Sequence, residues 1–382
     1  MTTVLAIDVG GTSTRVVVVD WLGGCLGRGS APGANPTSRG GDVAARNIVA
    51  AVGQAMSETA NRTEISTAVL AMAGSPALLD LPALSASLKS LGVNCALRIR
   101  PDSVAAFASG AWEADGYVLS VGTGSVAARV KSGELARCVD GMGWLLGDAG
   151  SGFWIGAMAL RAAVAALEGR SDPTSLTSLV LQDLEVTGKP LISRPGRAPV
   201  LDELIDTVYR MRPVEVARLA PHALQAAADG DRVARGIIDS AVHELLTTLQ
   251  ATWEPATSAP AHAAAPVTPV APVPASPSPP VTPVRDSLGT AEIDDAVPEN
   301  AAAGLDGPVV LSGSILHPDR YIGQAVRTGI IEIGIPPAQL RTAHDGVVGA
   351  AVLALREDGV TVDERLHARL TESIAAAVAD GG

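Results

Sequence analysis

The sequence predicts an α/β protein whose two domains face each other across a central cleft. Apolar and β-branched runs typical of strands alternate with amphipathic stretches typical of helices. A unit of strand, Gly/Thr/Ser-rich turn and strand occurs twice, at 4–20 and at 117–130. The length of 382 residues suits two domains better than one.

Periodicity and turn residues place the elements of the first half. The opening unit, Val4 to Asp20, reads as a tight hairpin because two β-branched runs flank its glycine- and hydroxyl-rich turn. After a turn at 33–36, the patterns predict a helix at 43–60, a strand at 67–73, a helix at 81–91, a strand at 95–99 and a helix at 104–112.

The second half repeats the opening pattern and then becomes mainly helical. Strands are expected at 117–121, 126–130 and 308–311, and helices through 153–253 and at 346–355 and 363–378. Gly230-Asp231 marks a helix break or an N-cap. The expected domains are 1–105, and 106–253 with 305–360; a C-terminal helix at 361–382 is expected to pack back on the first domain.

Residues 254–304 differ in composition from the rest of the chain. They are rich in Ala, Pro, Ser, Thr and Val and lack a usable period. Such a tract is expected to be a disordered, partly polyproline-like insertion. A tolerated surface insertion is favoured over a ligand for a proline-binding module.

Composition excludes several classes of protein. The net charge of −12 argues against a nucleic-acid partner. The three cysteines come without a CxxC pair or a histidine cluster, so neither a zinc site nor a disulfide framework is indicated. No apolar run is long enough to span a bilayer, and Asp8 interrupts the N-terminal apolar stretch too early for a signal peptide. We therefore expect a cytoplasmic protein without a membrane partner.

The first glycine-rich turn has the chemistry of an anion site. A hairpin excludes the P-loop and the dinucleotide fingerprint, which both need a helix after their glycines. Gly10 and Gly11 let backbone N–H groups approach an anion, and Thr12 and Thr14 add hydroxyl donors. Asp8 can hold a divalent cation directly or through water. The alternative is hairpin geometry alone, since glycine suits such turns.

A second turn strengthens the first. Gly122, Thr123 and Gly124 form the turn of the repeated unit, and two such hairpins on opposite sides of a cleft can clamp a polyphosphate. Gly313 and Ser314 follow a buried strand, where small residues allow a nucleoside to approach the backbone.

Asp102 is the candidate catalytic base. It follows a strand and precedes a helix, at the edge of an open α/β sheet where ligands bind. The alternative is a helix N-cap, a position that Asp suits well. Beside phosphate-holding hairpins, its carboxylate could accept the proton of a hydroxyl that attacks a γ-phosphate.

The stretch from Asp140 to Trp154 is the densest in glycines, acids and tryptophans. It is either a structural Ω-loop with a hydrophobic anchor or a sugar site. In a sugar site, the aromatic face of Trp144 would cover ring C–H groups and a carboxylate would accept two hydroxyls. Asn35, beside Pro36, is likewise either a turn residue or a ligand-binding amide.

Together these motifs resemble the N-acetylglucosamine kinase branch of the BadF/BadG/BcrA/BcrD ATPase family, within the actin-like, sugar kinase and Hsp70 ATPase fold. The resemblance covers nearly the whole chain except the insertion. The matching segments are Asp8–Thr14, Asn35, Pro101–Ser103, Gly122–Ser125, Gly143–Gly152, Ala220-Pro221, Gly230-Asp231, Leu311–Ser314 and Gly349-Ala350.

The resemblance implies two RNase-H-like domains that close on ATP, Mg²⁺ and an amino sugar, and it implies a homodimer. Asp102 would be the base for the sugar 6-hydroxyl, and Asp8 would position Mg²⁺. The phosphates would meet Gly10, Gly11, Thr12, Thr14, Gly122, Thr123 and Gly124. The nucleoside would lie by Gly313 and Ser314. The sugar would meet Asn35, Ser125, Trp144 and Asp148.

Two departures and two alternatives stay open. Ala149 stands where the family usually has Glu, which bears on sugar selectivity, and the insertion enters on the nucleoside side of the second domain. One alternative is the electron-activating branch of the superfamily, which needs a cysteine-ligated iron–sulfur cluster. The other is a non-catalytic sugar or nucleotide sensor. The sequence does not rank the possible amino sugars.

Overall fold

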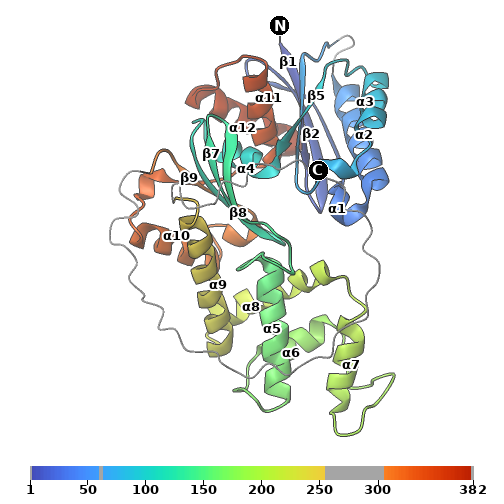
Figure 1. Ribbon diagram of the computed structural model, residues 1–382, viewed down its shortest axis with the longest axis vertical. Coiled ribbons are helices and arrows are strands. Elements are labelled where there is room, and N and C mark those ends of the chain that lie inside the picture. The colour runs from blue at the N-terminus through green and yellow to red at the C-terminus, as the bar shows by residue number, and fades with distance from the viewer. Residues whose placement is uncertain (1, 60–62, 254–304, 380–382) are drawn as a thin grey trace, which may run out of the picture.

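A computed structural model describes residues 2–59, 63–253 and 305–379. These residues form two five-stranded sheets with helices between and around them (Figure 1). The predicted α/β class is confirmed. The predicted insertion at 254–304 lies outside the described residues.

The first sheet has the strand order β3-β2-β1-β4-β5. Strands β1 to β3 form an antiparallel meander, and β4 and β5 run parallel to β1. The carboxyl ends of β1, β4 and β5 therefore meet at one edge of the sheet. The strands are β1 (Thr3–Val9), β2 (Ser13–Asp20), β3 (Cys25–Pro32), β4 (Thr67–Met72) and β5 (Leu97–Pro101).

The second sheet repeats this topology strand for strand. Its order is β10-β9-β6-β7-β8, with β6 to β8 antiparallel and with β9 and β10 parallel to β6. The predicted repeat of the strand–turn–strand unit is thus part of a duplicated five-stranded sheet. The strands are β6 (Gly116–Val121), β7 (Ser125–Lys131), β8 (Glu134–Asp140), β9 (Val309–Ser312) and β10 (Leu340–Thr342).

Alternation along β1 separates two cores. Leu5, Ile7 and Val9 pack with α2 and α3 on the outer face of the sheet, whereas Val4 and Ala6 face a central core. The central core also receives residues of β6, β7 and β9, so it is shared by the two sheets. The helices on the outer face are α1 (Pro36–Arg39), α2 (Gly41–Glu58) and α3 (Leu81–Ser90).

Helices also cover the outer face of the second sheet. Helices α8, α9 and α10 share a core with the outward residues of β6 and β9, while α5 to α7 extend the molecule away from the sheets (Figure 1). Asp231 caps α9 by accepting a hydrogen bond from the N–H of Ala234, as predicted. The helices are α5 (Gly152–Leu167), α6 (Leu176–Asp183), α7 (Pro199–Val208), α8 (Ala220–Ala228), α9 (Arg232–Gln250) and α10 (Tyr321–Glu332).

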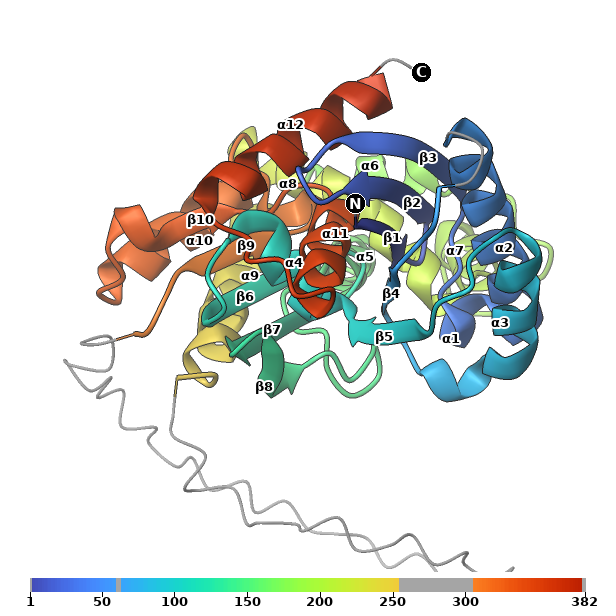
Figure 2. The same ribbon diagram turned by 90° about the horizontal axis from the view of Figure 1, so that it is seen from above.

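Two helices lie between the sheets, as Figure 2 shows, and join them through the central core. Helix α4 (Asp102–Gly110) follows the first sheet and contacts the second; α11 (Gly346–Glu357) follows the second and packs on the first. They approach closely at Gly349, whose Cα lies against the carbonyl of Ala105. The C-terminal helix α12 (Glu364–Ala379) packs on β3, where Ser373 Oγ accepts a hydrogen bond from the N–H of Cys25 at 2.7 Å.

Strands β3, β8 and β10 were not predicted from the sequence. In β3, Gly27 and Gly29 suggest a turn, yet an added Cβ at either would overlap a backbone oxygen of α2. These glycines let α2 lie directly on the strand. Strand β8 is an edge strand whose side chains are mostly exposed, so it shows little alternation. No helix in the described ranges is long and apolar enough to cross a membrane.

The contact between α4 and α11 predicts a size limit at Gly349. We expect Gly349→Ala to lower the free energy of unfolding by about 2 kcal/mol, because the new Cβ forces the helices apart. Urea unfolding followed by circular dichroism measures the change. Gly236→Ala is the matched control, because Gly236 is exposed in α9 and an added Cβ meets nothing within 4 Å. The control should be neutral or stabilising; equal losses in both variants would contradict the size limit.

Candidate active site

The first glycine-rich turn joins β1 to β2 and is closed by backbone hydrogen bonds. The N–H of Gly10 donates to the carbonyl of Ser13 at 3.0 Å, and the N–H of Gly33 donates to that of Thr12 at 3.0 Å. Gly11 and Thr12 are exposed at the tip, and an added Cβ on Gly11 meets nothing within 4 Å. The tip therefore presents open backbone, as an anion-binding turn requires.

Thr14 occupies a different position from Thr12. Its side chain is fully buried, and its hydroxyl donates a hydrogen bond to the carbonyl of Pro32 at 3.0 Å. This bond ties the start of β2 to the end of β3. In this arrangement the Thr14 hydroxyl supports the turn from behind; its predicted contact with phosphate stays a prediction.

Asp8 lies at the end of β1 on the face of the sheet that packs on α11. The parity of β1 places it there, because Val4 and Ala6 point into the central core. Its carboxylate lies against Gly346, where an added Cβ would be 2.6 Å from Oδ2. Among the described residues, nothing donates a hydrogen bond to this carboxylate. The pKa of Asp8 is raised to about 7, mainly by burial and then by the nearby carboxylates of Asp345 and Asp102, while Arg15 lowers it by less.

Asp102 is the first residue of α4, directly after β5. Pro101 holds the N-cap position, and Asp102 Oδ1 accepts a hydrogen bond from the N–H of Ser103 at 2.8 Å. Burial raises the pKa of Asp102 more than this hydrogen bond lowers it. Asp102 thus contributes to the helix start and also leaves a carboxylate within electrostatic reach of Asp8.

The second turn is built like the first and is tied to two further segments. The N–H groups of Gly152 and Phe153 donate to the carbonyls of Gly122 and Thr123 at 2.9 and 3.0 Å. The start of α5 is therefore fixed against this turn. Thr123 is exposed at the tip. Gly313 has a φ of +96° and lies so close to Val121 that an added Cβ would overlap the Val121 carbonyl. This close approach places Gly313 and the exposed Ser314 beside the second turn.

The loop between β8 and α5 is held by two carboxylates. Asp140 accepts hydrogen bonds from the N–H groups of Asp148 at 2.7 Å and Ala149 at 3.0 Å. Asp148, at a left-handed φ of 59°, accepts a bond from the N–H of Ser125 at 3.1 Å. The buried Ser125 hydroxyl donates to the carbonyl of Ala149 at 2.8 Å. Burial raises the pKa of Asp148, and Asp140 adds to this effect.

The other two predicted sugar residues are Trp144, in the loop between β8 and α5, and Asn35, at the start of α1. Trp144 is 44% exposed, and its ring is tilted against that of Phe153 with centroids 5.6 Å apart. Asn35 caps the short helix α1 through Oδ1, which accepts a hydrogen bond from the N–H of Thr37 at 2.9 Å. The turn role of Asn35 is therefore present, and its amide nitrogen has no hydrogen bond with the described residues.

Three acidic or thiol side chains at the site were missed by sequence reasoning. Asp345 ends the connection from β10 to α11 and forms an ion pair with Arg15 at 2.9 Å. For Asp140, the sequence predicted a place in the loop 140–154 but no role of its own. Cys138 on β8 has its thiol pKa raised by partial burial and by the charges of Asp102 and Asp140. Asp345 could have been predicted as a helix N-cap, because it is an acid directly before the apolar run 346–355. The roles of Asp140 and Cys138 depend on three-dimensional packing and have no such local signal.

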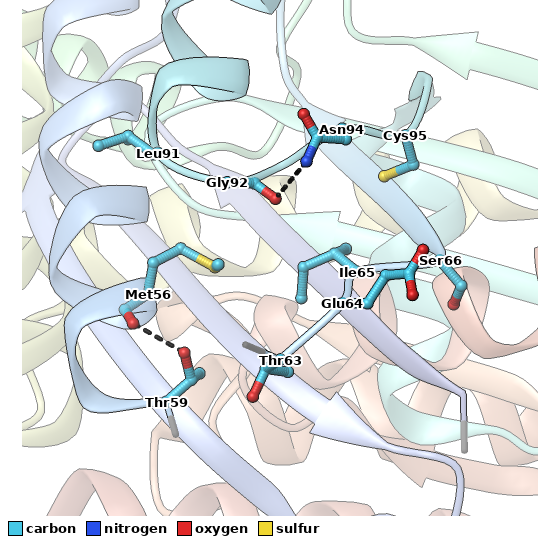
Figure 3. A pocket seen from close by; sticks show the side chains of 10 residues that line it. All are labelled: Met56, Thr59, Thr63, Glu64, Ile65, Ser66, Leu91, Gly92, Asn94 and Cys95. Atoms are coloured by element: carbon cyan, nitrogen blue, oxygen red, sulfur yellow. Dashed lines mark hydrogen bonds between the residues drawn. The ribbon is translucent and has the colours of Figure 1, made fainter. Parts of the chain in front are cut away.

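A cavity of about 620 Å³ lies away from these residues. Figure 3 shows its lining, which comes from the ends of α2 and α3 and from the segments before β4 and β5, including Ser66 and Cys95. These segments are at the opposite end of the strands from Asp8 and Asp102. Ligands of open α/β sheets bind at the carboxyl ends of strands, so the cavity is a poor match for the predicted site.

The residues present fit a magnesium ion carried by a nucleotide. Among the described residues, no three His, Cys, Asp or Glu side chains are grouped as a ready metal site. Mg²⁺ usually takes one or two carboxylates and completes its shell with phosphate oxygens and water. The carboxylate of Asp8, which accepts no hydrogen bond from the described residues and lies near an open glycine turn, matches that need.

The raised pKa of Asp8 predicts a pH-dependent effect on stability. An ordinary Asp titrates near 3.8 and Asp8 near 7, so burial of its charge destabilises the fold progressively as pH rises between these values. We expect Asp8→Asn to raise the free energy of unfolding at pH 8 by at least about 1 kcal/mol, and to change it little at pH 4. Urea unfolding at both pH values tests this. The exposed Asp239→Asn is the control, and a gain in Asp8→Asn that is equal at both pH values would contradict the effect.

The two hydrogen bonds to Asp140 predict a loop that depends on one carboxylate. Asp140→Asn offers one acceptor oxygen instead of two and leaves an N–H facing a donor. We expect amide hydrogen exchange across 141–150 to become at least about tenfold faster, a change of about 1.4 kcal/mol. Exchange measured by mass spectrometry tests this, with Asp239→Asn again as control. Unchanged protection of the loop would show that Asp140 does not hold it.

Two curated proteins are similar to this chain in sequence. An N-acetylmuramic acid/N-acetylglucosamine kinase of Clostridium acetobutylicum is 29% identical over 194 residues, or 50% of this chain and 59% of that protein. An N-acetyl-D-glucosamine kinase of Dictyostelium discoideum is 28% identical over 254 residues, or 63% of this chain and 76% of that protein. The alignment thus spans about three fifths of the Clostridium kinase.

Solved structures share the fold. A candidate N-acetylglucosamine kinase from Porphyromonas gingivalis has a TM-score of 0.60 at 18% identity, covering 94% of this chain and all of that one. A candidate N-acetylglucosamine kinase from Chromobacterium violaceum has a TM-score of 0.59 at 20% identity, covering 93% and 99%. At this identity the likeness concerns the two-domain, actin-like sugar kinase fold alone. The model of one family matches residues 5–258, and the chain belongs to that family, the BadF/BadG/BcrA/BcrD ATPase family.

Proposed function

We propose that this protein is an ATP-dependent amino-sugar kinase that phosphorylates the 6-hydroxyl of N-acetylglucosamine. The observation that supports this most is that two half-buried carboxylates, Asp8 near the end of β1 and Asp102 after β5, lie within electrostatic reach of each other at the edge of the sheet that carries the first glycine-rich turn. Phosphoryl transfer to a hydroxyl needs a metal–phosphate site and a base close together. Both curated relatives are named as kinases of N-acetylated amino sugars.

In the proposed reaction, Asp102 accepts the proton of the sugar 6-hydroxyl. The hydroxyl oxygen forms a bond to the γ-phosphorus of ATP, and the bond from that phosphorus to the β–γ bridging oxygen breaks, which releases ADP. Mg²⁺, when bound at Asp8, would neutralise charge on the phosphates. The tips at Gly11–Thr12 and Gly122–Thr123 would donate N–H and hydroxyl groups to the phosphates from two sides.

A base role suits the environment of Asp102. Burial raises its pKa, which makes the carboxylate a better proton acceptor than an exposed aspartate. The hydrogen bond from Ser103 fixes one carboxylate oxygen and leaves the other available.

The acceptor is proposed to bind between the first turn and the β8–α5 loop. Asn35 and Asp148 supply polar groups, Trp144 supplies an aromatic face, and Ser125 fixes the loop from within. N-acetylmuramic acid is the second acceptor to test, because the Clostridium relative is named for both sugars.

The two alternatives find less support. An iron–sulfur activator would need grouped cysteines, whereas Cys25 lies on β3, Cys95 before β5 and Cys138 on β8. A sensor without catalysis would not need a base beside the metal carboxylate. We further propose that the enzyme acts in the cytoplasm, where ATP and amino sugars are available, and that it is a homodimer.

Replacement of the base tests the reaction directly. We expect Asp102→Asn to lower kcat by a factor of about 10² to 10⁴ with ATP and sugar binding retained, because the amide cannot accept the proton. A coupled ADP assay and calorimetric binding measure both quantities. The assay should include N-acetylglucosamine, glucosamine, N-acetylmannosamine, N-acetylmuramic acid and glucose.

The control is Asp239→Asn, which should keep wild-type turnover. Near-normal turnover of Asp102→Asn would remove Asp102 as the base. Sugar and ATP binding without any ADP from the wild-type protein would favour the sensor instead.

A further inference from the structure

Arg15 is placed to bind Asp8 but binds Asp345 instead. The two residues are directly opposite each other in the antiparallel pair β1–β2, so their side chains project on the same face. Cross-strand pairs of this kind have Cβ atoms about 4.5–5.5 Å apart, well within the reach of an arginine. Yet Arg15 Nη1 lies 2.9 Å from Asp345 Oδ2, and Asp8 receives no hydrogen bond from Arg15.

Asp345 is itself fixed by the start of α11. It is the N-cap of this helix, and its Oδ1 accepts a hydrogen bond from the N–H of Val347 at 3.3 Å. The next residue, Gly346, lies against the Asp8 carboxylate. The N-terminus of α11 thus contacts both members of the cross-strand pair, Arg15 through an ion pair and Asp8 through a glycine.

We propose that Asp345 is a positioning residue that holds Arg15 away from Asp8 and so keeps the Asp8 carboxylate free for a divalent cation. This inference rests on the proposed function, in which Asp8 positions the metal of MgATP. Without the charge of Asp345, the Arg15 guanidinium still has the carboxylate of Asp8 within electrostatic reach, directly opposite it across the strand pair. An Arg15–Asp8 pair would neutralise the metal carboxylate and compete with the cation.

The proposal predicts that removing Arg15 rescues the loss of Asp345. Asp345→Asn keeps an N-cap side chain and removes only the charge, so α11 should still form. We expect this variant to bind Mn²⁺ in the presence of ADP about tenfold more weakly, and to raise KM for MgATP by a similar factor with a smaller change in kcat. The double variant Arg15→Gln/Asp345→Asn should return to within about threefold of wild type.

Free Mn²⁺ measured by electron paramagnetic resonance gives the affinity independently of turnover, and circular dichroism verifies folding. Asp172→Asn is the matched control, because Asp172 forms an exposed ion pair with Arg232 in the helical region. It should change neither quantity. A merely structural role for the ion pair would make the double variant as weak as Asp345→Asn or weaker, and that result would overturn the proposal.

Asp8→Asn separates this inference from the function on which it rests. If Asp8→Asn binds Mn²⁺–ADP as wild type does, Asp8 is not the metal carboxylate, and both the metal assignment and the inference are wrong. If Asp8→Asn loses the cation while Asp345→Asn binds it normally, the metal assignment stands and the role of Asp345 is wrong.

Discussion

The close contact between α4 and α11 is the constraint on which the rest of the structure depends. Each helix follows a strand of one sheet in the sequence and packs on the other sheet. The two sheets therefore share the central core, and each needs the other to bury its inner face. Only a glycine at position 349 allows the Ala105 carbonyl to approach this closely. The same packing brings the beginnings of both helices to the junction of the sheets: Asp102 starts α4, and Asp345 and Gly346 start α11. The packing that joins the two sheets therefore also brings the residues of the candidate active site together.

Negative charge is in excess at this junction, which suits a site that binds a divalent cation for phosphoryl transfer. The carboxylates of Asp8, Asp102 and Asp345 lie near one another, and Arg15 is the cation that offsets them in the described surroundings of Asp8. Burial and mutual repulsion raise the pKa of Asp8 to about 7, which is a cost to the folded protein without ligand. A divalent cation with its nucleotide would relieve this repulsion. The same repulsion that lowers the free energy of unfolding of the free protein would thus favour binding of the cation with its nucleotide.

Much of this arrangement could be predicted from the sequence, because its signals are local. The β-branched runs of the first hairpin, the two glycine-rich turns and Asp102 at a strand–helix boundary are each encoded in a short stretch of sequence, and the structure contains these elements as expected. Strand β3 was missed because Gly27 and Gly29 signal a turn locally, while their purpose is contact with α2. Asp140 and Asp345 were missed because their partners, the N–H of Asp148 and Arg15, become neighbours only through loop geometry and sheet packing. Thr14 and Ser125 have hydroxyls bound to backbone carbonyls, which their motifs could not reveal.

The central claim is that phosphate and sugar meet at the carboxyl edge of the first sheet, between Asp8 and Asp102. A crystal structure with Mg²⁺, a non-hydrolysable ATP analogue and N-acetylglucosamine tests it most directly. The account predicts the sugar 6-oxygen within about 2.6–3.2 Å of an Asp102 carboxylate oxygen, and the metal beside Asp8. A sugar bound elsewhere, such as in the cavity lined by Ser66 and Cys95 at the opposite edge, would contradict it.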